Sequence, residues 1–130
     1  MQAGTLMASP IVFVVDDDVS IRTAVRRLLL PLRHPVRLFS SAEQFLSRTE
    51  PGARGCLILD MRLPGITGLQ LQQHLAEQDW KLPIIFITAH DDAATRDAAL
   101  RRGAVDYLPK PFSCEHLLAT VRSAMDGSTT

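Results

Sequence analysis

The sequence has little of what several classes of protein depend on. Its two cysteines, Cys56 and Cys114, stand in no CxxC or zinc-ligand spacing, so we expect reduced thiols and no structural disulfide. No apolar run approaches the roughly 18 residues of a membrane-spanning helix. Residues 1–9 lack the order of a signal peptide, so we expect no membrane segment and a cytoplasmic location.

Lysine is scarce, and charge of neither sign predominates. Lys81 and Lys110 are the only lysines, and 14 basic residues balance 14 acidic ones. This balance argues neither for nucleic acid nor for a membrane surface as the partner. The 130 residues, 46% of them hydrophobic, suffice for one domain with a real core but not for two.

Five apolar runs of strand length recur along the chain, at 11–15, 36–39, 56–59, 84–87 and 104–108. Runs without polar alternation are typical of strands buried on both faces of a parallel sheet. Helical patterns follow each run: from Ser20 to Pro31, from a capping box at 40–43 to Arg48, from Thr67 through Leu75, over 91–102, and from Ser113 to Met125.

This alternation predicts an α/β fold, a doubly wound parallel sheet of five strands with five helices on its two faces. No Gly-rich phosphate loop follows the first strand, which favours a flavodoxin-like strand order, 2-1-3-4-5, over a dinucleotide-binding fold. We expect one domain at residues 10–125, a flexible leader at 1–9 and a flexible tail at 126–130.

Polar residues that a core does not need end four of the predicted strands. Residues 16–18, all aspartates, follow the first strand, Asp60 the third, Thr88 the fourth and Lys110 the fifth. Ligands of doubly wound sheets bind outside the carboxyl ends of the strands, so we expect these side chains to meet there. Taken singly, Asp18 is a helix cap, Thr88 a strand-end hydroxyl and Lys110 a solvated loop charge. Their convergence at one edge of the sheet favours a ligand-binding site over these separate local roles.

Carboxylates brought close together repel, and a bound cation relieves that cost. Oxygen ligands without histidine or cysteine suit a hard ion, Mg²⁺ or Mn²⁺. An aspartate beside the ion can act as the nucleophile in phosphoryl transfer, and the ion and Lys110 would offset charge on the transferred group. Thr88 could donate a hydrogen bond to the phosphoryl group.

Four segments, in order and at matching spacing, resemble the receiver domain of bacterial two-component response regulators: residues 14–18, 59–65, 87–90 and 103–112. The resemblance covers residues 10 to about 125 and is strongest to the FixJ-type subgroup, through the Pro64-Gly65 turn and residues 103–107 and 110–112. It implies a regulatory domain whose only chemistry is its own phosphorylation and dephosphorylation, not an enzyme.

The resemblance implies roles for the acidic positions. Asp60 would accept a phosphoryl group from a partner sensor histidine kinase. Asp17 would touch Mg²⁺ directly and Asp16 mainly through water. Asp60 and the backbone carbonyl of Arg62 would complete the protein's ligands to the ion.

It also implies a switch. Lys110 would pair with the phosphoryl group, with a cis bond to Pro111. Thr88 would move toward the phosphate while Tyr107 turns inward, reshaping the surface of the fourth helix (91–102) and the fifth strand. In the FixJ-type subgroup, phosphorylation promotes homodimerisation through that surface and controls a helix-turn-helix DNA-binding domain. This chain has no such segment, so it is either a truncated transcription factor, which the subgroup favours, or a single-domain switch.

Two alternatives and several residues remain. A Mg²⁺-dependent phosphohydrolase would place a second carboxylate where Arg62 stands. A receiver domain that has lost its chemistry would lack one of the site residues, whereas all five are present: Asp16, Asp17, Asp60, Thr88 and Lys110. Arg62 and His90 flank the expected site, where they could tune hydrolysis of the acyl phosphate; His90 is equally well an exposed loop residue. We expect the remaining histidines, His34, His74 and His116, on the surface or on helices. We expect Trp80 to pack at a helix end.

Overall fold

A computed structural model describes residues 9–128, so the expected leader lies outside the described residues apart from Ser9. Its strands form one parallel sheet in the order β2-β1-β3-β4-β5, which confirms the prediction. The strands are β1 (Ile11–Val15), β2 (Val36–Phe39), β3 (Gly55–Asp60), β4 (Ile84–Thr88) and β5 (Asp106–Pro109).

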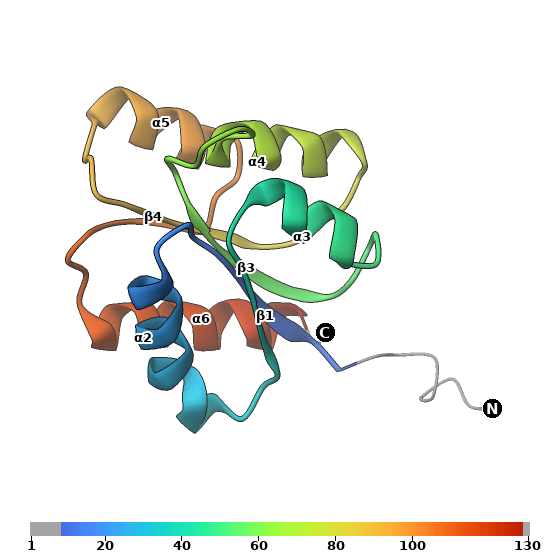
Figure 1. Cartoon of the computed structure of the whole chain (residues 1–130), viewed down its shortest axis with the longest axis vertical. Helices are drawn as coiled ribbons and strands as arrows, with labels where there is room; N and C mark the ends of the chain where they lie inside the picture. Colours follow the sequence, from blue (N-terminus) through green and yellow to red (C-terminus); the bar gives the residue numbers. More distant parts are fainter. Residues whose placement is uncertain (1–8, 129–130) are drawn as a thin grey trace.

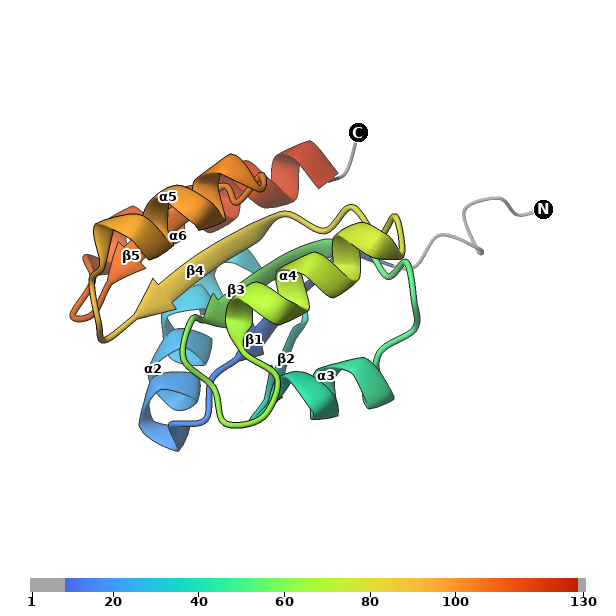
Figure 2. The ribbon, with the colours of Figure 1, turned by 90° about the horizontal axis from the view of Figure 1, so that it is seen from above.

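The helices cover both faces of this sheet (Figures 1 and 2). On one face lie α2 (Val19–Leu29) and α6 (Cys114–Ser128), and on the other α3 (Ala42–Arg48), α4 (Gly68–Glu77) and α5 (Ala93–Arg101). The inner strands are apolar on both sides because successive residues point to opposite layers: Phe13 packs in one core and Val14 in the other. Helix α6 continues to Ser128, so residues 126–128 are helical where the sequence pattern predicted a tail.

Helix starts follow their capping residues. Asp18 is the N-cap of α2, and its carboxylate accepts a hydrogen bond from the Ser20 backbone N–H at 2.8 Å. Ser41 caps α3 by accepting from the backbone N–H of Gln44 at 3.0 Å. The expected capping box at 40–43 was therefore wrong by one residue, because Gln44 and not Glu43 occupies the third helical position.

Trp80 lies just beyond the end of α4, as the sequence predicted. Its ring stacks on Phe45 with centroids 5.6 Å apart and planes 20° apart, and Phe45 meets Phe13 edge to face. These rings belong to the core on the α3–α4 face of the sheet, and the Trp80 indole N–H donates to the carbonyl of Ala53, just before the amino end of β3.

Candidate functional site

The strand register brings the predicted polar residues to one edge of the sheet. Val15 pairs with Leu59, so Asp16 and Asp60 follow as neighbours at the ends of β1 and β3. Thr88 pairs with Pro109, and the backbone N–H of the next residue, Lys110, donates to the Thr88 carbonyl at 2.6 Å. The edge therefore holds side chains from four separate segments.

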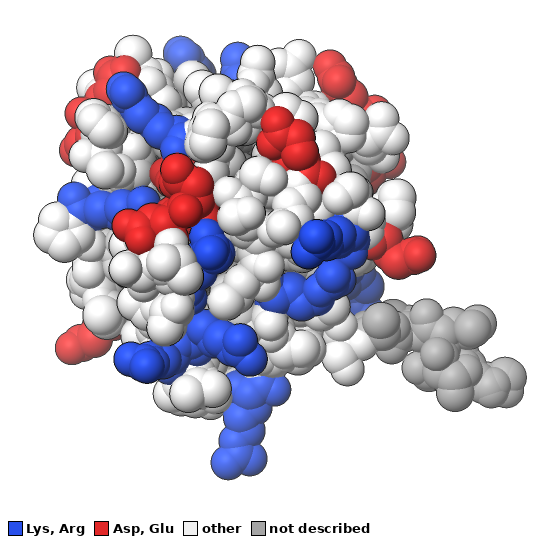
Figure 3. Space-filling model, viewed as in Figure 1, with Lys and Arg blue, Asp and Glu red and all other residues white. Residues whose placement is uncertain are grey.

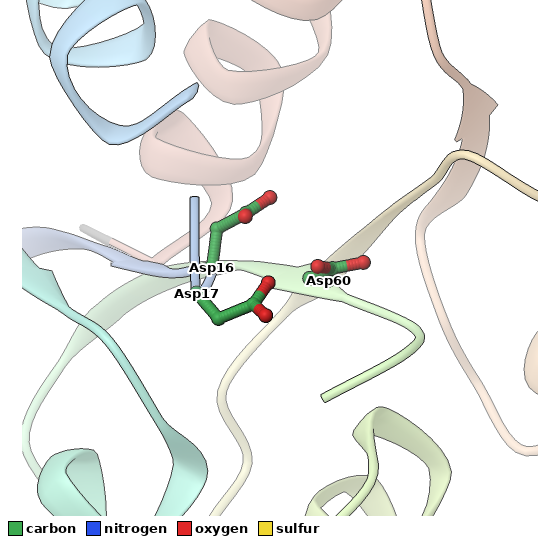
Figure 4. Close-up of side chains that lie close together, drawn as sticks. All are labelled: Asp16, Asp17 and Asp60. Atoms are coloured by element: carbon green, nitrogen blue, oxygen red, sulfur yellow. The ribbon is translucent and has the colours of Figure 1, made fainter. Parts of the chain in front are cut away.

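Three carboxylates meet at this edge (Figure 4). Asp16, Asp17 and Asp60 each offer an oxygen, and these oxygens all lie within 4.8 Å of one another. Asp16 and Asp60 are buried, whereas Asp17 is exposed. The acidic group is thus open to solvent on the side of Asp17.

Asp16 has partners for both its carboxylate oxygens. One accepts the backbone N–H of Asp18 at 2.8 Å, and the other lies 2.9 Å from the Lys110 ammonium. The guanidinium of Arg22 donates to its backbone carbonyl at 2.7 Å. A carboxylate with no exposed surface needs such partners to remain charged.

Asp60 is less well compensated than Asp16. The backbone N–H of Arg62 donates to one oxygen at 3.3 Å, and the Lys110 ammonium lies 3.7 Å from the other. Burial, and next the charge of Asp16, raise the pKa of Asp60 from 3.8 to about 6, although Lys110 acts to lower it. The carboxylate is therefore ionised at neutral pH, at a cost in free energy that a nearby cation would reduce.

The donor set fits a hard divalent cation. It consists of carboxylates alone, without the histidine or cysteine that zinc and copper sites use. Asp17 gives the group an oxygen in contact with solvent, from which an ion that keeps some of its water can bind. Such an acidic trio is typical of the metal site of receiver domains.

Thr88 and Tyr107 meet at the backbone of His90. The Thr88 hydroxyl accepts the His90 N–H at 3.0 Å and donates to its carbonyl at 3.1 Å. The buried Tyr107 places its hydroxyl 3.4 Å from the same carbonyl. The two residues predicted as a switch pair thus share one contact point in the β4–α5 loop. The Lys110–Pro111 bond is cis, as the resemblance implied.

Sequence reasoning missed three contacts. Arg22 holds the Asp16 carbonyl, and the carboxylate of Glu43 accepts the Ile66 N–H at 3.1 Å in the β3–α4 loop. His116 lies on a helix, as predicted, but no carboxylate was expected beside it, and Asp106 lies 2.7 Å from its Nε2. No spacing rule signals these pairs, because each joins residues from different elements.

Both cysteines are free, as predicted; Cys56 is buried, which raises the pKa of its thiol to about 12. Within residues 9–128, no helix combines the length and the apolar character needed to cross a bilayer.

The fold and the site together define a class: a parallel α/β sheet whose carboxyl edge gathers three aspartates, a lysine and a threonine. The sequence matches the response regulator receiver domain family over residues 12–122, and the chain belongs to this family. It is accordingly a phospho-accepting regulatory domain and not an enzyme in its own right.

Its relatives include transcriptional regulators. The chain is 42% identical over 125 residues to the transcriptional regulatory protein TdiR of Thauera aromatica, covering 96% of this chain and 55% of that protein. It is 35% identical over 114 residues to the transcriptional regulatory protein FixJ of Bradyrhizobium diazoefficiens, covering 88% and 56%. The solved structure of response regulator StyR superposes with a TM-score of 0.86 at 42% identity, covering 94% and 62%. The FixJ-type resemblance is confirmed, and the chain spans about half the length of these curated relatives.

Proposed function

We propose that this domain is a phosphorylation-activated switch that accepts a phosphoryl group on Asp60 from a partner histidine kinase in a Mg²⁺-dependent reaction. One observation carries the proposal. The Asp60 carboxylate lies within 4.8 Å of those of Asp16 and Asp17 and 3.7 Å from the Lys110 ammonium. A nucleophile, a cation site and a fixed positive charge therefore share one strand edge.

The transfer follows from the contacts of Asp60. An oxygen of its carboxylate attacks the phosphorus of the kinase's phosphohistidine, the P–N bond breaks as the P–O bond forms, and the released imidazole takes up a proton. With a pKa of about 6, Asp60 is ionised at neutral pH and able to attack. The Arg62 N–H orients one carboxylate oxygen, and the Lys110 ammonium, held by Asp16, faces the other.

The bound ion would be held by Asp17, Asp60 and the Arg62 carbonyl, with Asp16 acting mainly through water. Mg²⁺, or Mn²⁺ in its place, would supply positive charge against the phosphoryl oxygens. Asp17 suits direct contact because it is exposed, whereas both oxygens of Asp16 already have partners. These assignments distribute the three aspartates over three different tasks.

The output would begin at Thr88. Its hydroxyl would leave the His90 backbone and donate to the phosphoryl group, which removes one of the contacts that Thr88 and Tyr107 share. The surface of α5 and β5 would shift as a result, because a ligand that binds one arrangement better changes the populations of both. We propose that this surface supports a phosphorylation-induced homodimer and that the switch acts in the cytoplasm on a DNA-binding domain outside this chain.

Acetyl phosphate with Mg²⁺ tests the proposal without the kinase. Intact-mass spectrometry should show one phosphoryl adduct on the wild type, none after chelation with EDTA, and none on Asp60→Asn. Asp97→Asn, an exposed aspartate on α5, is the matched control and should be labelled like the wild type. An adduct that persists on Asp60→Asn, or that forms equally well without a divalent cation, would refute the assignment.

A further inference from the structure

The basic residues are unevenly distributed along the chain. Of 14 basic residues, five fall within residues 19–42, while none of the 14 acidic residues does; the five are Arg22, Arg26, Arg27, Arg33 and Arg37. The balanced net charge therefore conceals a basic segment formed by α2, the turn after it and β2. Figure 3 shows blue side chains gathered over the lower part of the molecule, where Figure 1 places α2 and the chain that follows it.

A hollow lies within this segment, where α2 passes into β2. It has a volume of about 370 Å³ and is lined by Arg26, Leu30, Arg33, His34, Pro35 and Val36. Leu30 is 68% exposed, more than any other large apolar side chain in the described part of the chain. An exposed leucine beside arginines gives a surface that can gain from both apolar burial and charge pairing.

Arg33 occupies a backbone conformation that does not suit it. Its φ of 61° and ψ of 22° are left-handed, and it caps the short 3₁₀ turn Leu30–Leu32 by donating its N–H to the Leu30 carbonyl at 3.1 Å. Glycine adopts this conformation without the clash that a Cβ introduces. The side chain is exposed, and neither Arg33 nor Arg26 forms a salt bridge within residues 9–128. Folding alone therefore gives no reason for an arginine here.

We propose that the hollow between Arg26, Leu30 and Arg33 is a docking surface for an acidic segment of a partner protein, one that places an apolar side chain between carboxylates. The guanidinium groups would bind the carboxylates in paired hydrogen bonds, and the apolar side chain would cover Leu30. Nucleic acid fits less well, because a phosphate backbone has no apolar group for Leu30, and the imidazole of His34 is the one aromatic ring that lines the hollow for a base to stack on.

The surface is separate from the phosphorylation site. Asp18 caps one end of α2 and Leu30 follows the other, and a helix of 11 residues spans roughly 16 Å. A partner bound there would leave Asp60 accessible, so the proposal does not depend on the function proposed for Asp60.

A second surface of the domain serves as the experimental control. At the end of α5, Arg101 and Arg102 are exposed, and Leu100 is 41% exposed. This surface has similar charge and apolar content but no arginine in a left-handed conformation. A merely electrostatic attraction for acidic peptides would act on both surfaces alike.

The test is a titration of the ¹⁵N-labelled protein with a synthetic peptide in which a leucine is flanked by glutamates. Amide shifts should concentrate at residues 26–36. Leu30→Ser and Arg33→Gly should each weaken the affinity about tenfold, while Arg101→Glu should not change it. Arg33→Gly should melt at the same or a higher temperature than the wild type, because glycine is at ease in the left-handed region.

Four results would overturn the proposal: shifts that spread equally over the α5 arginines, equal affinity for a peptide with serine in place of leucine, stronger shifts at 26–36 with duplex DNA, or self-association that Arg33→Gly abolishes. Leu30→Ser and Arg33→Gly, which lie away from the phosphorylation site and from α5, should still be labelled by acetyl phosphate like the wild type, which shows that their fold is intact.

Discussion

The two ends of the sheet carry side chains of opposite character. At the amino ends of the strands, the Trp80 ring stacks on Phe45, and its indole N–H donates to the Ala53 carbonyl at 2.9 Å. At the carboxyl ends, the buried carboxylates of Asp16 and Asp60 face each other with a single lysine between them. One end buries apolar surface, and the other buries charge.

This difference separates stability from function. Apolar burial with a satisfied indole N–H stabilises the fold at any pH. Buried charges contribute little net stability, and like charges close together cost free energy unless a ligand compensates for them. The carboxyl edge is thus built for an ion and a phosphoryl group, and the amino edge supplies part of the stability that this edge requires.

The largest expected effect is at the amino edge. Trp80→Ala removes the stacked ring and should lower the free energy of unfolding by about 4 kcal/mol, measured by urea denaturation, while the folded fraction is still labelled by acetyl phosphate. Trp80→Phe is the control and should lose about half as much. A loss on Trp80→Ala below about 1 kcal/mol would mean that the aromatic cluster does not stabilise this end of the sheet.

The next effect is at the carboxyl edge. Lys110→Met leaves Asp16 buried without its cationic partner and should cost about 3 kcal/mol of unfolding free energy at neutral pH. Lys81→Met, whose ammonium is exposed beside Asp79, should change stability by less than about 0.5 kcal/mol. Equal losses for the two lysines would show that Lys110 does not stabilise buried charge.

A third prediction concerns pH. Because the pKa of Asp60 is about 6 in the folded protein and 3.8 is its ordinary value, the folded state holds an extra proton between these values. The contribution of Asp60 to stability should therefore be largest below about pH 4, fall by about 3 kcal/mol in all as pH rises to about 6, and stay constant above that.

Asp60→Asn should lack this slope and be more stable than the wild type at neutral pH, where added Mg²⁺ should stabilise the wild type more than the variant. Urea titrations at several pH values measure both effects, with Asp97→Asn as the control for loss of an exposed carboxylate. A variant less stable than the wild type at neutral pH would show that the charge of Asp60 is well compensated without an ion.

The same contrast explains what the sequence could predict. Continuous apolar runs such as residues 11–15 and 84–87 admit little besides buried parallel strands, and the register of those strands then brings Asp16 beside Asp60. Residues at strand ends were therefore predictable as a group. Their individual roles rest on the family resemblance and remain proposals.

Contacts made by long side chains between elements were not predictable. Arg22 reaches back from α2 to the Asp16 carbonyl, and His116 reaches Asp106 on β5, through rotamers that no periodicity encodes. The predicted positions of helix ends were also imprecise. Asp126 is exposed and polar, which resembled a tail, although α6 continues past it and keeps Met125 buried.

The smallest prediction tests such an unforeseen contact beside the acidic edge. The Glu43 carboxylate accepts the Ile66 N–H at 3.1 Å, next to Gly65, whose φ of 76° makes the tight turn of the β3–α4 loop. The same loop carries the Arg62 carbonyl, which we propose as a metal ligand. Glu43→Ala should therefore weaken Mg²⁺ binding by about 0.5–1 kcal/mol, measured by calorimetry, because the loop loses an anchor.

Glu43→Gln is the control that separates geometry from charge. Its amide oxygen still accepts the Ile66 N–H, so Mg²⁺ affinity should stay near that of the wild type. If Glu43→Gln and Glu43→Ala weaken binding equally, the negative charge of Glu43 attracts the ion and the loop anchor contributes nothing. If neither variant changes the affinity, the residues at the strand ends bind the cation without help from the β3–α4 loop. The carboxyl edge then owes its function to the strand ends alone, as the amino edge owes its stability to the aromatic rings.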